Sequence, residues 1–124
     1  MKRDMDLVRE ILLKVEAEPA FDGNKNLLIN ASALKIVGYT DQEVLYNAVH
    51  LVEAGYLEGN TRMAHAGQVI VKKLTWRGHE YIDATRDPDI WEKTKAKAKI
   101  VTSVGVGMFL EIAKAEIKAK LGLQ

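Results

Sequence analysis

The chain has 124 residues, of which 48% are apolar and 28% are charged, and it contains no cysteine. This length fits one domain with a substantial core and leaves little room for a second. The lack of cysteine excludes disulfides, thiolate catalysis and Cys-based metal sites. The opening residues are charged rather than apolar, and no apolar run approaches the ~20 residues of a membrane helix. We therefore expect a cytoplasmic protein that does not enter a membrane.

Charge is distributed unevenly along the chain, although the net charge is only +1. Residues 31–60 carry one lysine and four acids, whereas residues 88–124 carry seven lysines and four acids. The sum is too small to attract a polyanion through a general field. Any contact with nucleic acid must therefore depend on local clusters of bases.

The first predicted element is a helix from Met5 to Val15, where apolar residues recur at three- and four-residue spacing. Asp4 is placed to cap the start of this helix, and Pro19 prevents its continuation. Turn-forming residues follow. The segment 27–38 then predicts a strand that leads into a short helical turn, because leucine and isoleucine residues precede a stretch that ends in glycine.

A capped helix is predicted after Thr40, since "TDQE" is a capping box in which the Glu43 side chain reaches back to the N–H of Thr40. One face of this helix is apolar, and Gly55 is a candidate for its C-cap. Two extended runs, "YLEGNTRM" and "QVIVKKL", follow with a short turn between them, which indicates a hairpin. Valines alternate with other residues in the second run, so one of its faces is expected to be buried.

Three further helices are predicted towards the C-terminus. One begins after Thr75, and the next is signalled by Asp87 at the N-cap with Pro88 at the first helical position. The last runs from about residue 103 to residue 121, and Gly122 closes it.

The final helix carries a wide apolar stripe. This stripe comprises Val104, Met108, Phe109, Ile112, Ala113, Ala115 and Ile117. Gly105 and Gly107 are costly inside a helix, so they suit either a close neighbour or a helix that begins after them. We expect the protein to form a homodimer through this helix; the alternative is that the helix folds back onto the first helix of its own chain.

The order of these elements is helix, strand, helical segment, capped helix, hairpin and helix. It predicts an α+β fold, a winged helix-turn-helix with a C-terminal helical extension. Residues 1–86 are expected to form the winged helix-turn-helix domain. Residues 87–124 are expected to form the helical extension, which packs on that domain or mediates dimerisation.

Four stretches of the sequence also resemble a known family. "MKRDMDLVREILL", "GYTDQEV", "LVEAGYLEG" and "LTWRGHEYIDATRDPDIWEKTK" are similar to an uncharacterised bacterial and phage family, domain of unknown function 2513. The resemblance covers most of the chain and implies a winged-helix-like fold in a bacterial or prophage protein, with no activity to transfer. The family typically has Tyr-His followed by a Lys-containing "LL" stretch, where this chain has Tyr46-Asn47 and "VHLV". This departure removes two groups able to contact phosphate and weakens a DNA-binding interpretation.

DNA binding by a transcriptional regulator is the leading functional expectation. The second helix of such a fold reads base edges through exposed polar side chains, while nearby bases hold the phosphates. The helix after Thr40 has no Lys or Arg and three acids, so positive charge has to come from the hairpin. The residues expected to contact DNA are Gln42, Tyr46, Asn47, His50, Arg62, Lys72 and Lys73.

The alternative is a non-enzymatic adaptor that uses the same fold to bind a protein partner. The lysine run at 93–99 is spaced by two, so it suits a solvated helix, or else a contact with the phosphate backbone. His50, His65 and His79 lack the spacing of metal ligands, and no phosphate loop or nucleophile motif occurs. We therefore expect no catalytic residue, no metal and no cofactor.

The stretch "LTWRGHEYID" gathers five reactive-looking side chains in ten residues. Its spacing nevertheless fits an ordinary amphipathic helix. We expect Thr75 to cap this helix, Trp76 to pack at the joint with the preceding strand, and Gly78 to let the helix lie close to its neighbour. The charged side chains are expected to face water, so the stretch is interpreted as structural.

Overall fold

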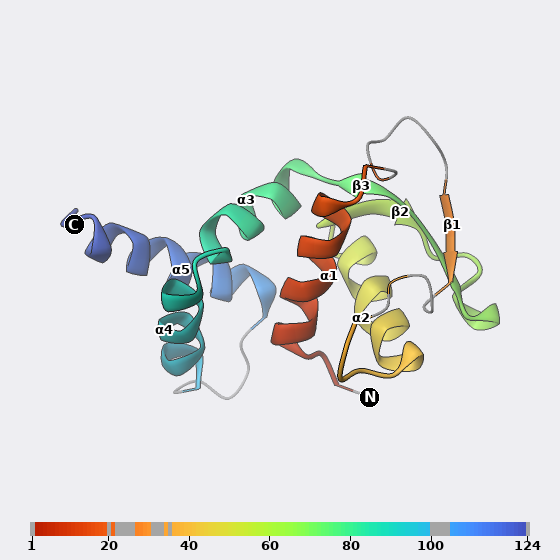
Figure 1. The fold of residues 1–124 in the computed structure, drawn as a ribbon, viewed down its shortest axis with the longest axis horizontal. Helices are drawn as coiled ribbons and strands as arrows, with labels where there is room; N and C mark the ends of the chain where they lie inside the picture. Colours follow the sequence, from red (N-terminus) through yellow and green to blue (C-terminus); the bar gives the residue numbers. More distant parts are fainter. Residues whose placement is uncertain are drawn as a thin grey trace. The chain divides into compact units, whose positions relative to one another are not determined.

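The computed structural model describes residues 2–19, 21, 27–30, 34, 36–99 and 105–123. The elements are α1 (Met5–Ala17), β1 (Leu27–Asn30), α2 (Asp41–Glu53), β2 (Leu57–Asn60), a 3-10 turn η2 (Ala64–Ala66), β3 (Gln68–Leu74), α3 (Trp76–Thr85), α4 (Pro88–Ala98) and α5 (Val106–Lys120) (Figure 1). The fold class is α+β, as predicted. Contacts divide the chain into two compact units, Met1–His79 and Glu80–Gln124.

The helix ends in the first unit follow from local side-chain chemistry. Asp4 caps α1, and its Oδ1 accepts a hydrogen bond from the N–H of Leu7 at 3.1 Å. The predicted capping box at α2 is confirmed. The N–H of Glu43 donates to Thr40 Oγ1 at 3.1 Å, and the N–H of Thr40 donates to Glu43 Oε1 at 3.0 Å. These bonds satisfy N–H groups that have no partner inside the helix.

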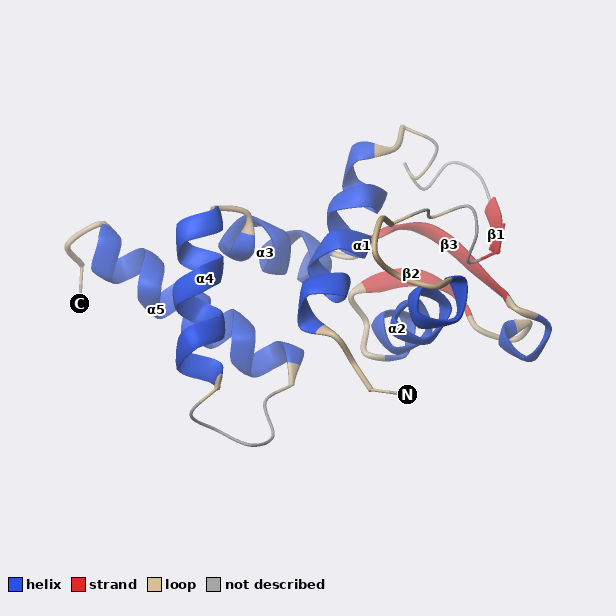
Figure 2. Cartoon of the chain, turned by 60° about the horizontal axis from the view of Figure 1, so that its bottom comes forward, coloured by secondary structure: helices blue, strands red, loops and turns tan. Residues whose placement is uncertain are grey.

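The first unit contains an antiparallel three-stranded sheet of order β1-β3-β2 (Figure 2). Helices α1 and α2 both contact β3, and α2 also contacts β2. Val69 and Val71 of β3 are buried, as their alternation predicts, so this face of the sheet meets the helices. The helices contribute Leu7, Ile11, Leu12, Val44, Ala48 and Leu51 to the same core. The predicted helical turn before Gly38 falls largely on residues outside the described ones.

A bulge interrupts the pairing of β2 with β3. Glu58 is opposite Lys73 and Gly59 is opposite Val71, so Lys72 is an extra residue in β3. The extra residue shifts the alternation by one position. Leu74 is therefore buried in place of Lys73, and two consecutive lysines remain outside the core.

A joint of close backbone contacts connects the end of α2 to the start of α3. Gly55 has a φ of 84°, which turns the chain from α2 into β2. Thr75 Oγ1 donates to the carbonyl of Gly55 at 2.6 Å and accepts from the N–H of Gly78 at 3.0 Å. The carbonyl of Tyr56 accepts from the N–H of Thr75 at 3.3 Å and lies directly against Gly78. The predicted cap at Thr75 and the predicted close approach at Gly78 are both confirmed.

One expectation for this joint is wrong. Trp76 does not pack there, since it is 85% exposed at the first position of α3. Arg77 takes the place expected for it: its guanidinium carbon lies 4.7 Å from the centre of the Tyr56 ring, and Nη1 donates to the carbonyl of Ala54 at 3.3 Å. A guanidinium can cover an aromatic face while it donates to a helix-terminal carbonyl, and the long Arg77 side chain makes both contacts here.

In the second unit, α4 and α5 pack against each other. Asp87 caps α4 with Pro88 at its start, as predicted. The rings of Trp91 and Phe109 lie 5.6 Å apart between their centres. The helix α5 begins at Val106, after Gly105, whose backbone is extended at the N-cap. The predicted start near residue 103 is therefore wrong for α5, and the alternative that the helix begins after Gly105 is confirmed.

Only part of the apolar stripe predicted for α5 is buried. Phe109 and Ala113 are in the core of the second unit, whereas Met108 and Ala115 are exposed. Gly122 closes the helix as expected, with a φ of 75°.

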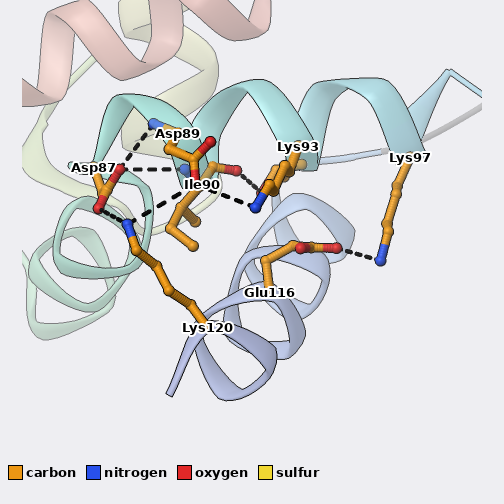
Figure 3. A network of polar contacts seen from close by, with 8 residues as sticks. Asp87, Asp89, Ile90, Lys93, Lys97, Glu116 and Lys120 are labelled. Carbon is orange, nitrogen blue, oxygen red and sulfur yellow. Dashed lines mark hydrogen bonds and ion pairs between the residues drawn. The ribbon is translucent and has the colours of Figure 1, made fainter. Parts of the chain in front are cut away.

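Ion pairs connect α4 and its N-cap to α5 (Figure 3). Lys120 Nζ lies 2.8 Å from Asp87 Oδ2 and 3.9 Å from Asp89 Oδ2. Lys97 pairs with Glu116, whose side chain is 8% exposed. The other carboxylate oxygen of Asp87 accepts from the backbone N–H of Asp89 at 2.8 Å, so one side chain both caps α4 and binds α5.

The pairing of Asp87 predicts a dependence of stability on pH. The hydrogen bond from Lys120 and then those from the backbone N–H groups of Asp89 and Ile90 lower the pKa of the Asp87 carboxyl below its ordinary 3.8. A lowered pKa stabilises the fold above the unfolded value, and this contribution is lost as the pH falls through the folded value. We expect Asp87→Asn, which keeps a cap but loses the charge, to lower the melting temperature near neutral pH.

The difference from the wild type should shrink as the pH falls below 3.8. Thermal unfolding followed by circular dichroism at a series of pH values measures it. A difference that stays constant down to acid pH would show that the charge of Asp87 does not contribute. Asp83→Asn removes an exposed acid of α3 that pairs with Arg86 three residues away, and it serves as the control for the loss of an ordinary surface ion pair.

Candidate nucleic-acid interface

The helix α2 presents one polar face outside the core. Gln42 is exposed near its start, and Tyr46 and His50 follow at four-residue intervals and are half-buried. The rings of Tyr46 and His50 meet edge to face with 4.5 Å between their centres. This contact restrains both side chains in one line along the helix. Three of the four α2 residues expected to contact DNA therefore share one strip of surface.

The fourth, Asn47, is not on this surface. It is 1% exposed, and its side chain joins two segments that are far apart in the sequence. Oδ1 accepts from the N–H of Asp4 at 3.0 Å, and Nδ2 donates to the carbonyl of Glu43 at 2.9 Å. The expectation that Asn47 is exposed to pair with adenine is therefore wrong, because both ends of its amide are used inside the protein.

The hydrogen bond of Asn47 brings the N-terminal residues to α2. Asp4 is held against the middle of α2, so the adjoining Lys2 and Arg3, both exposed, extend from that point. These two bases supply positive charge beside a helix that has neither Lys nor Arg. Lys2 and Arg3 are not among the DNA-contacting residues predicted from the sequence. The available signal was the pair of bases directly before the predicted N-cap Asp4.

Tyr39 makes a second connection between the N-terminal residues and α2, through a hydrogen bond to Asp4. Burial raises the pKa of its hydroxyl, and the negative charges of Asp4 and Asp6 and a hydrogen bond to Asp4 raise it further. The hydroxyl therefore stays protonated well beyond neutral pH and remains a donor to Asp4. Because Tyr39 directly precedes the cap of α2, the N-terminal residues are fixed to both the start and the middle of this helix.

The hairpin places its three candidate bases differently. Arg62 is exposed in the turn after β2, where the backbone N–H of this residue donates to Asn60 Oδ1 at 2.7 Å. Lys73 Nζ lies 3.9 Å from Glu58 Oε2. Lys72 borders a shallow cavity of about 260 Å³ that Glu58 also lines. Both lysines lie outside the face of β3 that meets the helices, and Glu58 lies near both of them.

The candidate residues thus fall on two surfaces. Gln42, Tyr46 and His50 lie along the exposed side of α2, and Arg62 lies in the hairpin turn. Lys2 and Arg3 adjoin Asp4, which is hydrogen-bonded to the buried Asn47 of the same helix. Lys72 and Lys73 lie outside the face of β3 that meets the helices. Lys72 alternates with the buried valines, and the bulge places Lys73 outside the core as well. The structure does not bring these two lysines to the exposed strip of α2.

The lysine run of α4 is largely engaged in ion pairs. Lys93 Nζ lies 3.2 Å from Asp89 Oδ2, Lys95 Nζ lies 3.0 Å from Glu92 Oε1, and Lys97 pairs with Glu116. Three of the four cations are therefore accompanied by an acid, and the fourth, Lys99, is exposed, in agreement with a solvated helix. These lysines contribute little net positive charge to a phosphate contact.

The three histidines lie in α2, in η2 and in α3, as His50, His65 and His79. Within the described residues, no group of three or more His, Asp or Glu side chains could hold a metal ion. The helices in that part of the chain are also too short or too polar to cross a membrane.

The structure defines an α+β protein in which helices cover one face of a three-stranded antiparallel sheet. The helix α2 carries a strip of polar residues outside the core. The family described as "Hypothetical protein (DUF2513)" matches residues 2–105, and the chain belongs to this family. A protein of Haemophilus influenzae that bears the name "Uncharacterized protein" is 33% identical over 100 residues, which cover 80% of this chain and 80% of that protein. No solved structure matches the chain.

Proposed function

We propose that the protein binds DNA as a winged helix-turn-helix regulator, with α2 as the helix that enters the major groove. Three features support this arrangement. The sheet has the order β1-β3-β2, the capped helix α2 comes directly before β2, and the β2–β3 hairpin has an exposed basic residue in its turn. In such domains a helix reads the groove and neighbouring segments hold the backbone.

The observation that carries the proposal is the hydrogen bond from the N–H of Asp4 to Asn47. It fixes the residue that follows Lys2 and Arg3 to α2, so these two bases can neutralise phosphates that this acidic helix could not hold itself. Gln42 is then the side chain able to pair with a base edge, since an amide can bond adenine through two atoms. Tyr46 and His50 are hydrogen-bonding groups for phosphate or sugar oxygens.

A gel shift with genomic fragments at about 50 mM and about 200 mM salt tests this function, because phosphate contacts make DNA affinity fall steeply with salt. Lys2→Ala and Arg3→Ala should each weaken binding to all fragments alike and reduce the salt slope by about 1. Gln42→Ala should instead reduce discrimination between fragments. The control is Lys14→Ala, an exposed lysine at the other end of α1. No retained fragment at the lower salt concentration would refute the proposal.

A second candidate function is docking of a protein partner, which the exposed side chains Trp76 and Met63 favour. They are 85% and 42% exposed, respectively, and a large exposed aromatic is a frequent anchor at protein interfaces. Under this function, Trp76→Ala abolishes binding of a purified candidate partner and leaves DNA retention unchanged. A partner that binds the wild type and Trp76→Ala equally does not bind through Trp76.

A further inference from the structure

The helix α5 has an exposed apolar stripe in addition to its buried face. Phe109, Leu110 and Ala113 point into the second unit and are buried. The exposed stripe consists of Met108, Ile112, Ala115 and Ala119, spaced by four, three and four residues. Met108 is 53% exposed, both alanines are exposed, and Ile112 is half-buried. Alternating spacing of three and four is the pattern by which one helix meets another along a seam.

We propose that this stripe binds the same stripe of a second copy of the chain, with the two α5 helices antiparallel. In one register, Met108 lies over Ala119 of the second copy and Ile112 lies over Ala115 of the second copy. A twofold axis repeats both layers. Each layer pairs a large side chain with a small one, which lets the two helices interdigitate closely.

The charged residues beside the stripe favour a second copy of the chain as the partner, and they favour the antiparallel orientation of the two helices. Glu111 and Lys118 are seven residues apart, so they lie on the same side of the stripe. In the antiparallel pair, Glu111 of each copy is near Lys118 of the other, whereas a parallel pair places like charges together. Glu111 is 3.9 Å from Lys114 of its own helix, and among the described residues Lys118 forms no ion pair.

The size of the stripe predicts a weak and reversible dimer. The 15 residues of α5 span about 22 Å, so a single helix pair buries less than the ~800 Å² per partner of a standard interface. We expect a dissociation constant of about 10–100 μM. The proposal does not depend on DNA binding, so a failed gel shift leaves it standing.

Sedimentation velocity of the full chain from about 5 μM to about 500 μM tests the dimer at the expected affinity. Glu111→Lys and Lys118→Glu should each weaken it about tenfold, since each removes two exposed ion pairs and adds repulsion. The double variant exchanges the two charges and should restore the wild-type affinity. Lys99→Glu makes the same charge change at the end of α4 and serves as the control. Circular dichroism verifies that every variant keeps its helices.

Orientation is tested by cross-linking, for which the absence of cysteine from the chain is convenient. Ala115→Cys lies near the twofold axis of an antiparallel pair and should form a disulfide-linked dimer under mild oxidation. Met108→Cys should not, because the two cysteines would be about 16 Å apart along the helix axis. A monomer at the highest concentration, cross-linking of both variants alike, or charge variants that leave the affinity unchanged would overturn the proposal.

Discussion

Gly78→Ala is expected to destabilise the protein by about 2–3 kcal/mol. A Cβ at this position overlaps the carbonyl oxygen of Tyr56 and lies 3.3 Å from Leu74 Cδ2. The obstacle is backbone, which already accepts a hydrogen bond from Thr75, so α3 has to move away from β2 to admit a methyl group. At an exposed helix position, Gly→Ala stabilises by up to about 1 kcal/mol. A decrease in the free energy of unfolding would therefore show that Gly78 is in close contact with the Tyr56 carbonyl.

Chemical denaturation with fluorescence detection measures the change in the free energy of unfolding. The matched control is His79→Ala, the next position of α3, whose side chain is exposed. This variant should differ from the wild type by no more than about 0.5 kcal/mol. A Gly78→Ala variant as stable as the wild type would show that the joint between α2 and α3 is looser than the structure indicates.

Asn47→Ala is expected to reduce both stability and DNA affinity. The N–H of Asp4 loses its acceptor and a buried side-chain volume is emptied, which together cost about 2 kcal/mol. Asp4 then keeps only its hydrogen bond to Tyr39 at the start of α2, so Lys2 and Arg3 are no longer held at the middle of this helix. We expect the DNA affinity to fall by as much as in the double variant Lys2→Ala/Arg3→Ala.

A double-mutant cycle separates this positioning role from direct base contact. Added to Lys2→Ala/Arg3→Ala, Asn47→Ala should cause no further loss of affinity, because the bases that it positions are already gone. Discrimination between fragments should also be unchanged. Losses that simply add, or a change in sequence preference, would argue against positioning. Unfolding curves establish that each variant is folded at the temperature of the binding assay.

Elements with strong local signals were predicted well from the sequence. The capping box at Thr40, the cap at Asp87 and the glycine stop at Gly55 each depend on residues within one turn, so neighbouring letters are enough to identify them. The alternation in β3 was likewise sufficient to predict which valines are buried. The α+β class followed from the order of these elements.

The errors concern side chains whose partners are distant in the sequence. Asn47 is polar and lies at the edge between the buried and exposed faces of α2, so a helical wheel alone could not tell whether it was buried. Its partner, Asp4, is 43 residues away. Trp76 was expected in the joint because aromatic residues are usually buried, yet Arg77 reaches Tyr56 instead. The site was predicted in part for the same reason: residues on one helix could be grouped, but the contribution of the N-terminal residues depended on a long-range hydrogen bond.

The extra residue in β3 also affects how the sheet meets other molecules. Within the described residues, the edge strands β1 and β2 have four residues each, and the bulge at Lys72 lies directly beside the edge strand β2. Short edges with a local irregularity and charged flanks are poor templates for an incoming strand. We therefore expect the proposed dimer to form through its helices without starting a continuous sheet between copies.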